Sequence, residues 1–371
     1  MRIPLSKPWI TEDEARQAAE VVASGWLISG PKTEAFEDRF AKAVGVSHAV
    51  AVNSGSSALL VALAALGVEP GDEVIVPNMT FIATASAALF LGARPLFADI
   101  EPHTYGLDPN DLEHRITPRT RGIIPVHYAG QTAEMGPILE VAHAHGLFVL
   151  EDAAESHLAR YGDQPSGGMG HMGIFSFTPS KLITTGEGGM ITTNEPALAE
   201  RARLIRNFGD TGKFAWELLG YNFRMPEVAG AVGLVQLEKL EEAASRRRAI
   251  AQTYTEAFTF LPALQPPYVR NLADHVFQLY TVLLDLEQLT ISRDEVIQAL
   301  EKQGVASRLY YPCLHRQRVF EARGLHPPGP YPQAETFERR AFSLPIYPTM
   351  TEAEVHYVIE TVTTVIETHR R

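Results

Sequence analysis

The sequence predicts an α/β protein: a mainly parallel seven-stranded sheet sandwiched by helices, followed by a smaller α+β domain at the C-terminal end. Three observations lead to this fold class. The chain has 371 residues, which is more than one simple core usually organises. From about residue 48, short apolar runs alternate with helical stretches, a pattern typical of a parallel sheet with both faces covered. Near residue 262 this alternation gives way to a different arrangement.

Seven short apolar runs are the predicted strands, because each is nearly continuously apolar, as strands buried on both faces are. They lie at residues 48–53, 73–78, 95–100, 122–127, 147–152, 173–177 and 189–193. Several of the segments between them are Ala-rich or amphipathic and predict helices. These helices lie at residues 57–67, 81–92, 134–145 and 195–206.

A long helix is predicted to leave the large domain after Pro226, since no further proline occurs until Pro262 and Val228, Val232 and Val235 fall at helical spacing. On this helix, the arginine run at 246–248 predicts a solvated face. Beyond it, the segments read as strand, helix, strand and helix, at residues 276–285, 293–303, 305–311 and 351–368. We therefore expect a large domain at residues 1–245 and a small domain at residues 246–371.

Composition limits the classes of partner. The formal net charge of −12 argues against a nucleic-acid binder and against an anionic membrane surface. The longest nearly apolar runs, residues 58–68 and 81–93, are shorter than the roughly 20 residues that a membrane span needs. Residues 1–10 lack the features of a secretory signal, and the single cysteine, Cys313, cannot form an internal disulfide. We expect a cytoplasmic protein.

Polar residues follow three of the predicted strands, at the strand ends where open α/β sheets bind ligands. Residues 53–58 form a hydroxyl-rich turn that opens a helix, which suits either a phosphate or an ordinary helix N-cap. Asp152 directly follows an apolar run and is backed by small alanines. Its carboxylate could face a flat ring, cap the structure or bind a metal.

Lys181 lies at the third strand end, five residues after Ser176 and ahead of a Gly-rich run. The default for a lysine is the surface, but Lys181 has apolar neighbours and no other cation in its segment. A desolvated lysine loses its proton more readily and becomes nucleophilic. A phosphate cradle, a carboxylate and such a lysine are the parts that pyridoxal phosphate (PLP) requires.

With these residues the chain resembles the DegT/DnrJ/EryC1/StrS aminotransferases, a branch of the fold-type I PLP enzymes, whose fold is that of aspartate aminotransferase. The resemblance runs along essentially the whole chain. It includes residues 25–31, 53–59, 76–81, 125–131, 151–155, 175–189, 220–225 and 343–348. It implies a transaminase that passes an amino group from glutamate, through pyridoxamine phosphate, to a nucleotide-linked keto-sugar. No metal is expected.

The resemblance also implies roles for residues around the ring of PLP. Lys181 would hold the aldehyde as a Schiff base and then move the proton. Asp152 would pair with the pyridine nitrogen. Ala154 and Phe81 would pack on the two faces of the ring, and Glu155 would lie near the phenolic oxygen, where a carboxylate needs a proton or another donor beside it.

The phosphate of PLP would be bound by three serines, Ser56, Ser57 and Ser176. In this family an asparagine of a second subunit completes the phosphate site, and Asn222 occupies the matching position. The resemblance therefore implies a homodimer with a shared active site.

Substrate recognition is less clearly marked. Tyr310, Tyr311 and His315 lie in a segment that resembles the family's substrate-proximal loop, with simple packing as the alternative. Residues 185–189 resemble those of enzymes that aminate C4 of a 4-keto-6-deoxyhexose, although relatives acting on non-sugar cyclic ketones share the glutamate. Related sugar dehydratases replace the lysine by histidine. A non-catalytic PLP-binding regulatory protein would have lost Lys181 or Asp152, and both are present.

Overall fold

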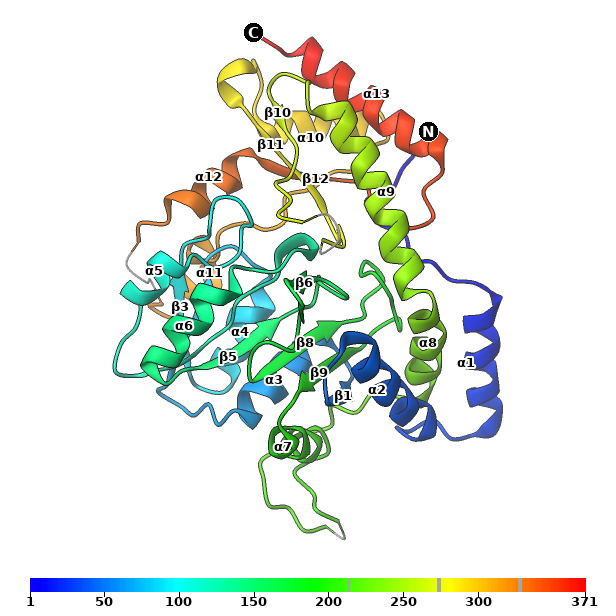
Figure 1. Cartoon of the computed structure of the whole chain (residues 1–371), viewed down its shortest axis with the longest axis vertical. Helices are drawn as coiled ribbons and strands as arrows, with labels where there is room; N and C mark the ends of the chain where they lie inside the picture. The colour runs from blue at the N-terminus through cyan, green and yellow to red at the C-terminus, as the bar shows by residue number, and fades with distance from the viewer. Residues whose placement is uncertain (213, 272–274, 326–328) are drawn as a thin grey trace.

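Seven strands form one sheet, as predicted (Figure 1). The computed structural model describes residues 1–212, 214–271, 275–325 and 329–371. The strand order is β1-β9-β8-β5-β4-β2-β3, and β9 runs antiparallel to both of its neighbours, while the other pairs are parallel. The strands are β1 (His48–Val52), β2 (Glu73–Pro77), β3 (Arg94–Ala98), β4 (Thr120–Ile123), β5 (Phe148–Asp152), β8 (Met172–Ser176) and β9 (Gly189–Thr193).

Both faces of this sheet are buried, which explains why its strands are apolar throughout rather than alternating. In β1, Val50 and Val52 join an apolar core with helix α3, whereas Ala49 and Ala51 join a second core with Phe36 of helix α2. The covering helices include α2 (Pro31–Val44), α3 (Gly55–Ala65), α4 (Ile82–Phe90), α6 (Met135–His145) and α7 (Pro196–Arg206). The four helices predicted between strands are thus confirmed to within two residues at each end.

One predicted strand ends earlier than expected. The run at 122–127 pairs in β4 only as far as Ile123. Beyond it the chain turns away from the ladder, with a single bridge between Val126 and Asp152, and enters the short 3-10 turn η1 (Tyr128–Gly130). This departure brings the turn at Ala129 close to the end of β5.

The long helix predicted after Pro226 is two helices, α8 (Glu227–Glu238) and α9 (Leu240–Phe258), which meet at Lys239. The ammonium group of Lys239 bonds the carboxylate of Glu14 in α1 (Glu12–Ser24) and the Trp9 carbonyl. The prediction of a solvated arginine face is wrong for Arg247, whose side chain is only 1% exposed.

The C-terminal part contains a three-stranded antiparallel sheet with helices packed on it, above the large sheet in Figure 1. Residues 305–311 form no strand but make two isolated bridges, Ile3 with Val305 and Arg308 with Ser343. The elements are β10 (Leu264–Gln265), β11 (Tyr280–Leu284), β12 (Ala341–Leu344), α10 (Arg293–Lys302), α11 (Arg318–Glu321), α12 (Pro332–Arg340) and α13 (Glu352–Thr368).

The predicted domain boundary at 245/246 falls inside α9, which runs from the large sheet up to α13 (Figure 1). The N-terminal Ile3 packs in the C-terminal apolar core. The division into residues 1–245 and 246–371 stays a prediction. The remaining short elements are α5 (Pro109–His114), β6 (Arg160–Tyr161), β7 (Gln164–Pro165) and the 3-10 turns η2 (Leu286–Gln288) and η3 (Leu314–Arg316). Among the described helices, none is long and apolar enough to cross a membrane.

Candidate active site

A cavity of about 380 Å³ lies where β5 and β8 end and α3 begins. It brings together residues from all three polar strand ends that the sequence analysis singled out. These lining residues include Ser56, Phe81, Asp152, Ala154, Glu155, Ser176, Lys181, Tyr310 and Tyr311. The carboxyl ends of neighbouring strands meet at one edge of a sheet, so residues far apart in the sequence converge there.

The hydroxyl-rich turn forms the cavity wall at the start of α3. Ser54 is the N-cap, and its hydroxyl accepts a hydrogen bond from the Ser57 amide at 3.0 Å. A Cβ atom built on Gly55 would lie only 2.8 Å from the Cβ of Ser176, so the turn sits directly on the end of β8. Hydroxyl groups at a helix N-terminus make this end of the cavity a good site for an anion.

Ser57 is placed differently from Ser56 and Ser176. Its hydroxyl donates to the Asn53 side-chain oxygen at 2.6 Å, and Ser57 is not among the residues that line the cavity. In this chain Ser57 supports the turn from behind.

Asp152 is the last residue of β5 and is buried. One carboxylate oxygen accepts from the Thr84 hydroxyl at 2.8 Å, and the other accepts from the Ala154 amide at 3.2 Å. Burial raises the pKa of Asp152, and these two bonds oppose that rise. A buried carboxylate beside an open cavity favours a ligand that presents a cationic N–H to it.

Lys181 and Glu155 face each other, with 3.2 Å between Nζ and Oε1. Both side chains are largely buried, at 12% and 7% exposure. The loop that carries the lysine is fixed by a bond from the C-terminal part of the chain, since the Gln278 side-chain amide donates to the Ser180 carbonyl at 2.6 Å. Lys181 is therefore largely buried rather than on the open surface.

Besides Ser57, two predicted site residues do not line this cavity. Asn222 is exposed and pairs with Asn207 at the base of a projecting loop, which also exposes Phe208, Trp216 and Tyr221. His315 bonds the buried Asn78, with 2.7 Å between the Asn78 side-chain nitrogen and Nδ1. Neither His315 nor Asn78 is among the residues that line the cavity.

Several residues of the site were not foreseen from the sequence. Thr84 and the backbone amide of Ala129 each bond a predicted site residue, and Gln278 bonds Ser180, the neighbour of Lys181. Ala129 lies in the segment 125–131 that carries the resemblance, but the sequence does not mark it as a partner of Glu155. These contacts join residues that lie 26 to 98 positions apart along the chain, so only the tertiary structure reveals them.

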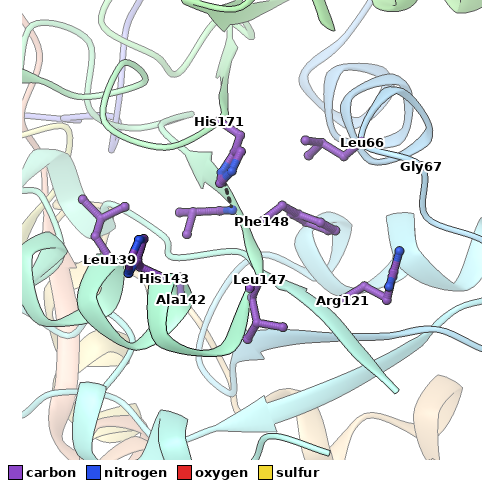
Figure 2. Close-up of a pocket in the computed structure, with 11 residues that line it drawn as sticks. Leu66, Gly67, Arg121, Leu139, Ala142, His143, Leu147, Phe148 and His171 are labelled. Carbon is purple, nitrogen blue, oxygen red and sulfur yellow. Dashed lines mark hydrogen bonds between the residues drawn. The ribbon is translucent and has the colours of Figure 1, made fainter. Parts of the chain in front are cut away.

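A second hollow, of about 580 Å³, lies near the start of β5 (Figure 2). It is lined mainly by apolar side chains, with Arg121, His143 and His171 at its edges. The Nδ1 atom of His171 accepts from the Val149 amide at 3.1 Å and is thereby engaged in holding the backbone. The lining includes no carboxylate or hydroxyl group, so this hollow lacks the acid and lysine of the first cavity.

Comparison with known proteins identifies the family. Residues 8–363 match the sequence pattern of the DegT/DnrJ/EryC1/StrS aminotransferase family. The chain belongs to this family. GDP-perosamine synthase from Caulobacter vibrioides is 40% identical over 362 residues, which cover 96% of each chain. The likeness thus extends along nearly the full length of both proteins.

Solved structures agree with this assignment. DesV from S. venezuelae has a TM-score of 0.90 and 37% identity, covering 98% of this chain and 99% of its own. A putative sugar aminotransferase from Streptococcus pneumoniae, Spr1654 in its PLP form, has a TM-score of 0.92 and 30% identity, covering 99% of each chain. The protein is therefore a sugar aminotransferase of a PLP-dependent family, with the fold that the sequence predicted.

Proposed function

We propose that this aminotransferase binds PLP in the cavity at the ends of β5 and β8, and passes an amino group from glutamate to a nucleotide-linked 4-keto-6-deoxyhexose. One observation carries the proposal: Lys181, Asp152 and the hydroxyl turn at Ser56 line the same cavity. Each of them matches a different part of one cofactor.

The residues fit PLP by their chemistry. Ser56, at the N-terminus of α3, and Ser176, at the end of β8, suit its phosphate, and Ser57 supports the turn that carries Ser56. The buried Asp152 lacks a cationic partner within hydrogen-bonding distance among the described residues, and a protonated pyridine nitrogen would supply one. Ala154 and Phe81 both line the space that a flat ring would occupy.

When bound, PLP supplies an aldehyde that takes up the amino group and a ring that accepts electrons. The protein's own groups then hold and move protons. Asp152 keeps the proton on the ring nitrogen. Lys181 would hold the cofactor. Its Nζ would move a proton between the substrate carbon that carries the amino group and the cofactor, in one direction with the donor and in the opposite direction with the acceptor. The burial of Lys181 limits access of water to these transfers.

The likeness to GDP-perosamine synthase and one segment of the chain support the proposed acceptor class. Residues 185–189 contain Glu187, which lines the cavity. The resemblance of this segment supports amination at C4 of a 4-keto-6-deoxyhexose. We assign Tyr310 to the substrate side of the cavity, because it lines the cavity from the C-terminal part of the chain. His315 contributes indirectly, through Asn78.

We further propose a homodimer in which Asn222 of each subunit reaches the phosphate site of the other. Asn222 is exposed and its loop exposes several large aromatic side chains, which single chains rarely leave uncovered. A cytoplasmic location completes the proposal and rests on the sequence alone.

The test follows the absorbance of the bound cofactor. Purified protein should show the visible band of bound PLP and lose it on addition of glutamate. A panel of nucleotide-linked keto-sugars, together with a non-sugar cyclic ketone, is then added to the pyridoxamine form. Return of the band with a 4-keto-6-deoxyhexose nucleotide is the expected result. Return with the cyclic ketone alone, or full turnover by K181A, would overturn the proposal.

A further inference from the structure

The carboxylate of Glu155 is held by donors from three separate parts of the chain. Its Oε1 atom accepts from the Tyr311 hydroxyl at 2.8 Å and lies 3.2 Å from Lys181 Nζ. Its Oε2 atom accepts from the Ala129 amide at 3.0 Å. Glu155 is buried, so these contacts replace water as its hydrogen-bond partners.

The direction of the bond between Tyr311 and Glu155 is fixed by chemistry. Burial, and the charge of Glu155 beside it, raise the pKa of Tyr311 well above its usual value. The phenol therefore keeps its proton and donates it. The Ala129 amide can only donate as well. Both carboxylate oxygens accordingly act as acceptors, which suits an ionised Glu155 opposite the lysine.

Tyr311 is also held firmly in place. Its ring packs against Phe81 and Tyr310, with centroids 5.8 and 5.1 Å apart. The hydroxyl of Tyr128 donates to the Tyr310 carbonyl, which fixes the backbone just before Tyr311. A tyrosine whose ring and backbone are both fixed is suited to orient a neighbouring side chain rather than to move toward a substrate.

We propose that Tyr311 is a positioning residue, whose hydroxyl orients Glu155 toward Lys181 and toward the phenolic oxygen of the cofactor. The inference rests on the proposed function, because it assumes PLP in this cavity. It answers a question that the sequence left open: the hydrogen-bond donor beside the Glu155 carboxylate is the Tyr311 hydroxyl. Tyr311 thereby sets how strongly Glu155 stabilises a proton on the lysine nitrogen.

The first experiment compares Y311F with Y310F. Y311F removes only the hydroxyl, which leaves Glu155 with one donor fewer and makes it a stronger partner for a proton on Nζ. The pH midpoint of the visible absorbance change of the resting holoenzyme should rise by about one unit. Among the described residues, the donors to Glu155 are Tyr311, Lys181 and Ala129 and not Tyr310, so Y310F should leave this midpoint unchanged.

A second readout uses protein from which PLP has been removed. The rate at which PLP reloads depends on unprotonated Lys181, so the pH midpoint of this rate should also rise in Y311F. An unchanged midpoint in both measurements, or an equal rise in Y310F, would overturn the role of Tyr311.

E155Q provides the internal control. Loss of the carboxylate charge should lower both midpoints, and adding Y311F to E155Q should cause no further change. A rise in the double variant would show that Tyr311 acts through another group. If Y311F fails to fold, E155Q alone tests the proposal. Unchanged pH midpoints in E155Q would show that Glu155 does not stabilise a proton on the lysine nitrogen, and the proposal would fall.

The two proposals fail in different ways. None of these midpoints requires an acceptor sugar, so a wrong acceptor class leaves the expected shifts intact. Conversely, if Tyr311 has no positioning role, the proposed amination of the keto-sugar by the wild-type protein is unaffected.

Discussion

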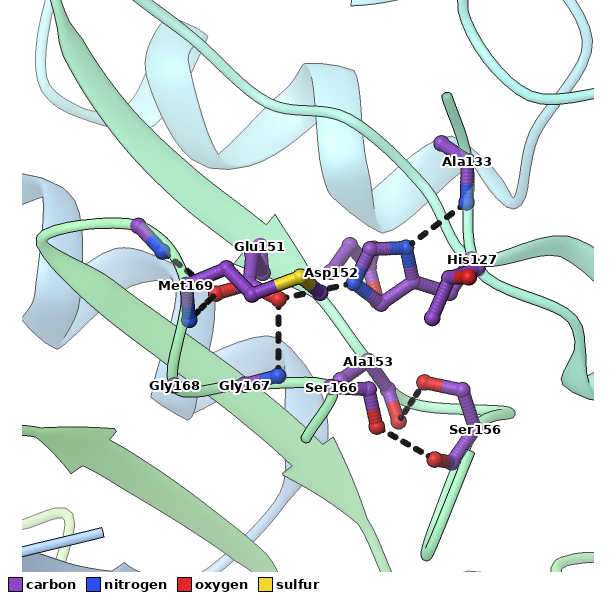
Figure 3. A network of polar contacts seen from close by, with 12 residues as sticks. His127, Ala133, Glu151, Asp152, Ala153, Ser156, Ser166, Gly167, Gly168 and Met169 are labelled. Atoms are coloured by element: carbon purple, nitrogen blue, oxygen red, sulfur yellow. Dashed lines mark hydrogen bonds and ion pairs between the residues drawn. The ribbon is translucent and has the colours of Figure 1, made fainter. Parts of the chain in front are cut away.

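The imidazole of His127 and the carboxylate of Glu151 form a fully buried pair directly behind Asp152, with 2.9 Å between Nε2 and Oε2 (Figure 3). The His127 Nδ1 atom accepts from the Ala133 amide at 3.2 Å, so Nε2 carries the proton and donates it. Glu151 also accepts three backbone amides, those of Gly167, Met169 and Gly170, at 2.8, 2.7 and 2.6 Å.

This pair connects the loop at 167–170 with the strand end that carries Asp152. The backbone is joined at the same place, because the Asp152 amide donates to the Pro125 carbonyl at 2.9 Å and the His127 amide donates to the Asp152 carbonyl at 3.0 Å. The Glu151 carboxylate accepts hydrogen bonds from four donors and holds this network together. The position of Asp152 depends on it.

The first prediction concerns Glu151. In E151Q one acceptor oxygen becomes an NH₂ group, which leaves at least one buried amide without a partner. Each such group costs about 1–3 kcal/mol, so the free energy of unfolding should fall by at least that amount. Urea denaturation measures it. The same substitution at the exposed Glu140 of α6 should change stability by less than about 0.5 kcal/mol. Equal effects at the two sites would contradict the prediction.

The second prediction separates stability from catalysis at Asp152. Its pKa is raised in the folded protein, so its contribution to stability is present at low pH and is lost as the pH rises through the folded value. Without PLP, D152N should therefore unfold at a higher temperature than the wild type at pH 7. With PLP, D152N should lower kcat by about two to three orders of magnitude, because the ring nitrogen loses its anion.

T84V is the graded control for Asp152. It removes the hydroxyl that donates to Oδ2 and should reduce kcat by only about tenfold. If D152N retained wild-type turnover, or destabilised the PLP-free protein, the assignment of Asp152 to the ring nitrogen would be wrong.

Much of this site was predictable because the parallel sheet itself brings it together. Asp152, Ser176 and the turn near Ser56 follow apolar strands, and the carboxyl ends of such strands share an edge. Lys181 was marked by its apolar neighbours. For these residues, local sequence and the strand pattern carry enough information.

The third prediction concerns the turn that holds the phosphate. A methyl group on Gly55 would lie 2.8 Å from Cβ and 3.0 Å from Oγ of Ser176. In G55A the turn must move away from β8, so the Kd for PLP should rise by about tenfold or more. Equilibrium dialysis of PLP measures it. Gly136 in α6 is the control, since a methyl there meets only the end of the Tyr161 side chain. Unchanged PLP affinity in G55A would argue against a phosphate at this turn.

The fourth prediction is a pH dependence. His157 is buried among Phe40, Phe175 and Phe177, and burial lowers its pKa to about 3. The unfolded chain binds a proton near pH 6.5 and the folded chain does not, so stability is lost as the pH falls from 6.5 toward 3. The loss for this one residue is up to about 1.4 kcal/mol per pH unit.

H157F should flatten this dependence, because the phenylalanine ring fits an aromatic site and carries no titratable group. Urea midpoints between pH 4.5 and 7 measure the slope. His145, exposed at the end of α6, is the control, and H145F should keep the wild-type slope. A wild-type slope in H157F would mean that His157 takes up its proton in the folded state.

The rest of the architecture could not be predicted, because it depends on contacts between distant segments. Tyr311 bonds Glu155 across 156 residues, and Gln278 bonds Ser180 across 98. The break between α8 and α9 lies at Lys239, whose ammonium group bonds Glu14, 225 residues away along the chain. Arg247 lies at helical spacing from Ala243 and Ala251, on the buried side of α9, whereas Arg246 is exposed. The groups that its guanidinium contacts there come from distant segments and could not be predicted.

The last prediction therefore concerns Arg247. Its Nη1 group donates to three backbone carbonyls, those of Phe277, Gln278 and Ile346, at 3.1, 3.0 and 3.0 Å. Burial lowers its pKa to about 9, so the charge persists at neutral pH. R247A leaves three buried carbonyls and a cavity, and should reduce the free energy of unfolding by more than about 3 kcal/mol. Through Gln278 it should also loosen the lysine loop and raise the Kd for PLP.

Arg246 is the matched control, one residue away on the same helix. It is exposed, pairs with Glu242 four residues earlier and lies over the Trp9 ring. Such surface contacts contribute at most about 1 kcal/mol, so R246A should change stability little and PLP affinity not at all. If R247A and R246A changed the free energy of unfolding and the Kd for PLP equally, the prediction would be wrong. Arg247 would then not stabilise the fold, and its contact with Gln278 would not support the loop of Lys181.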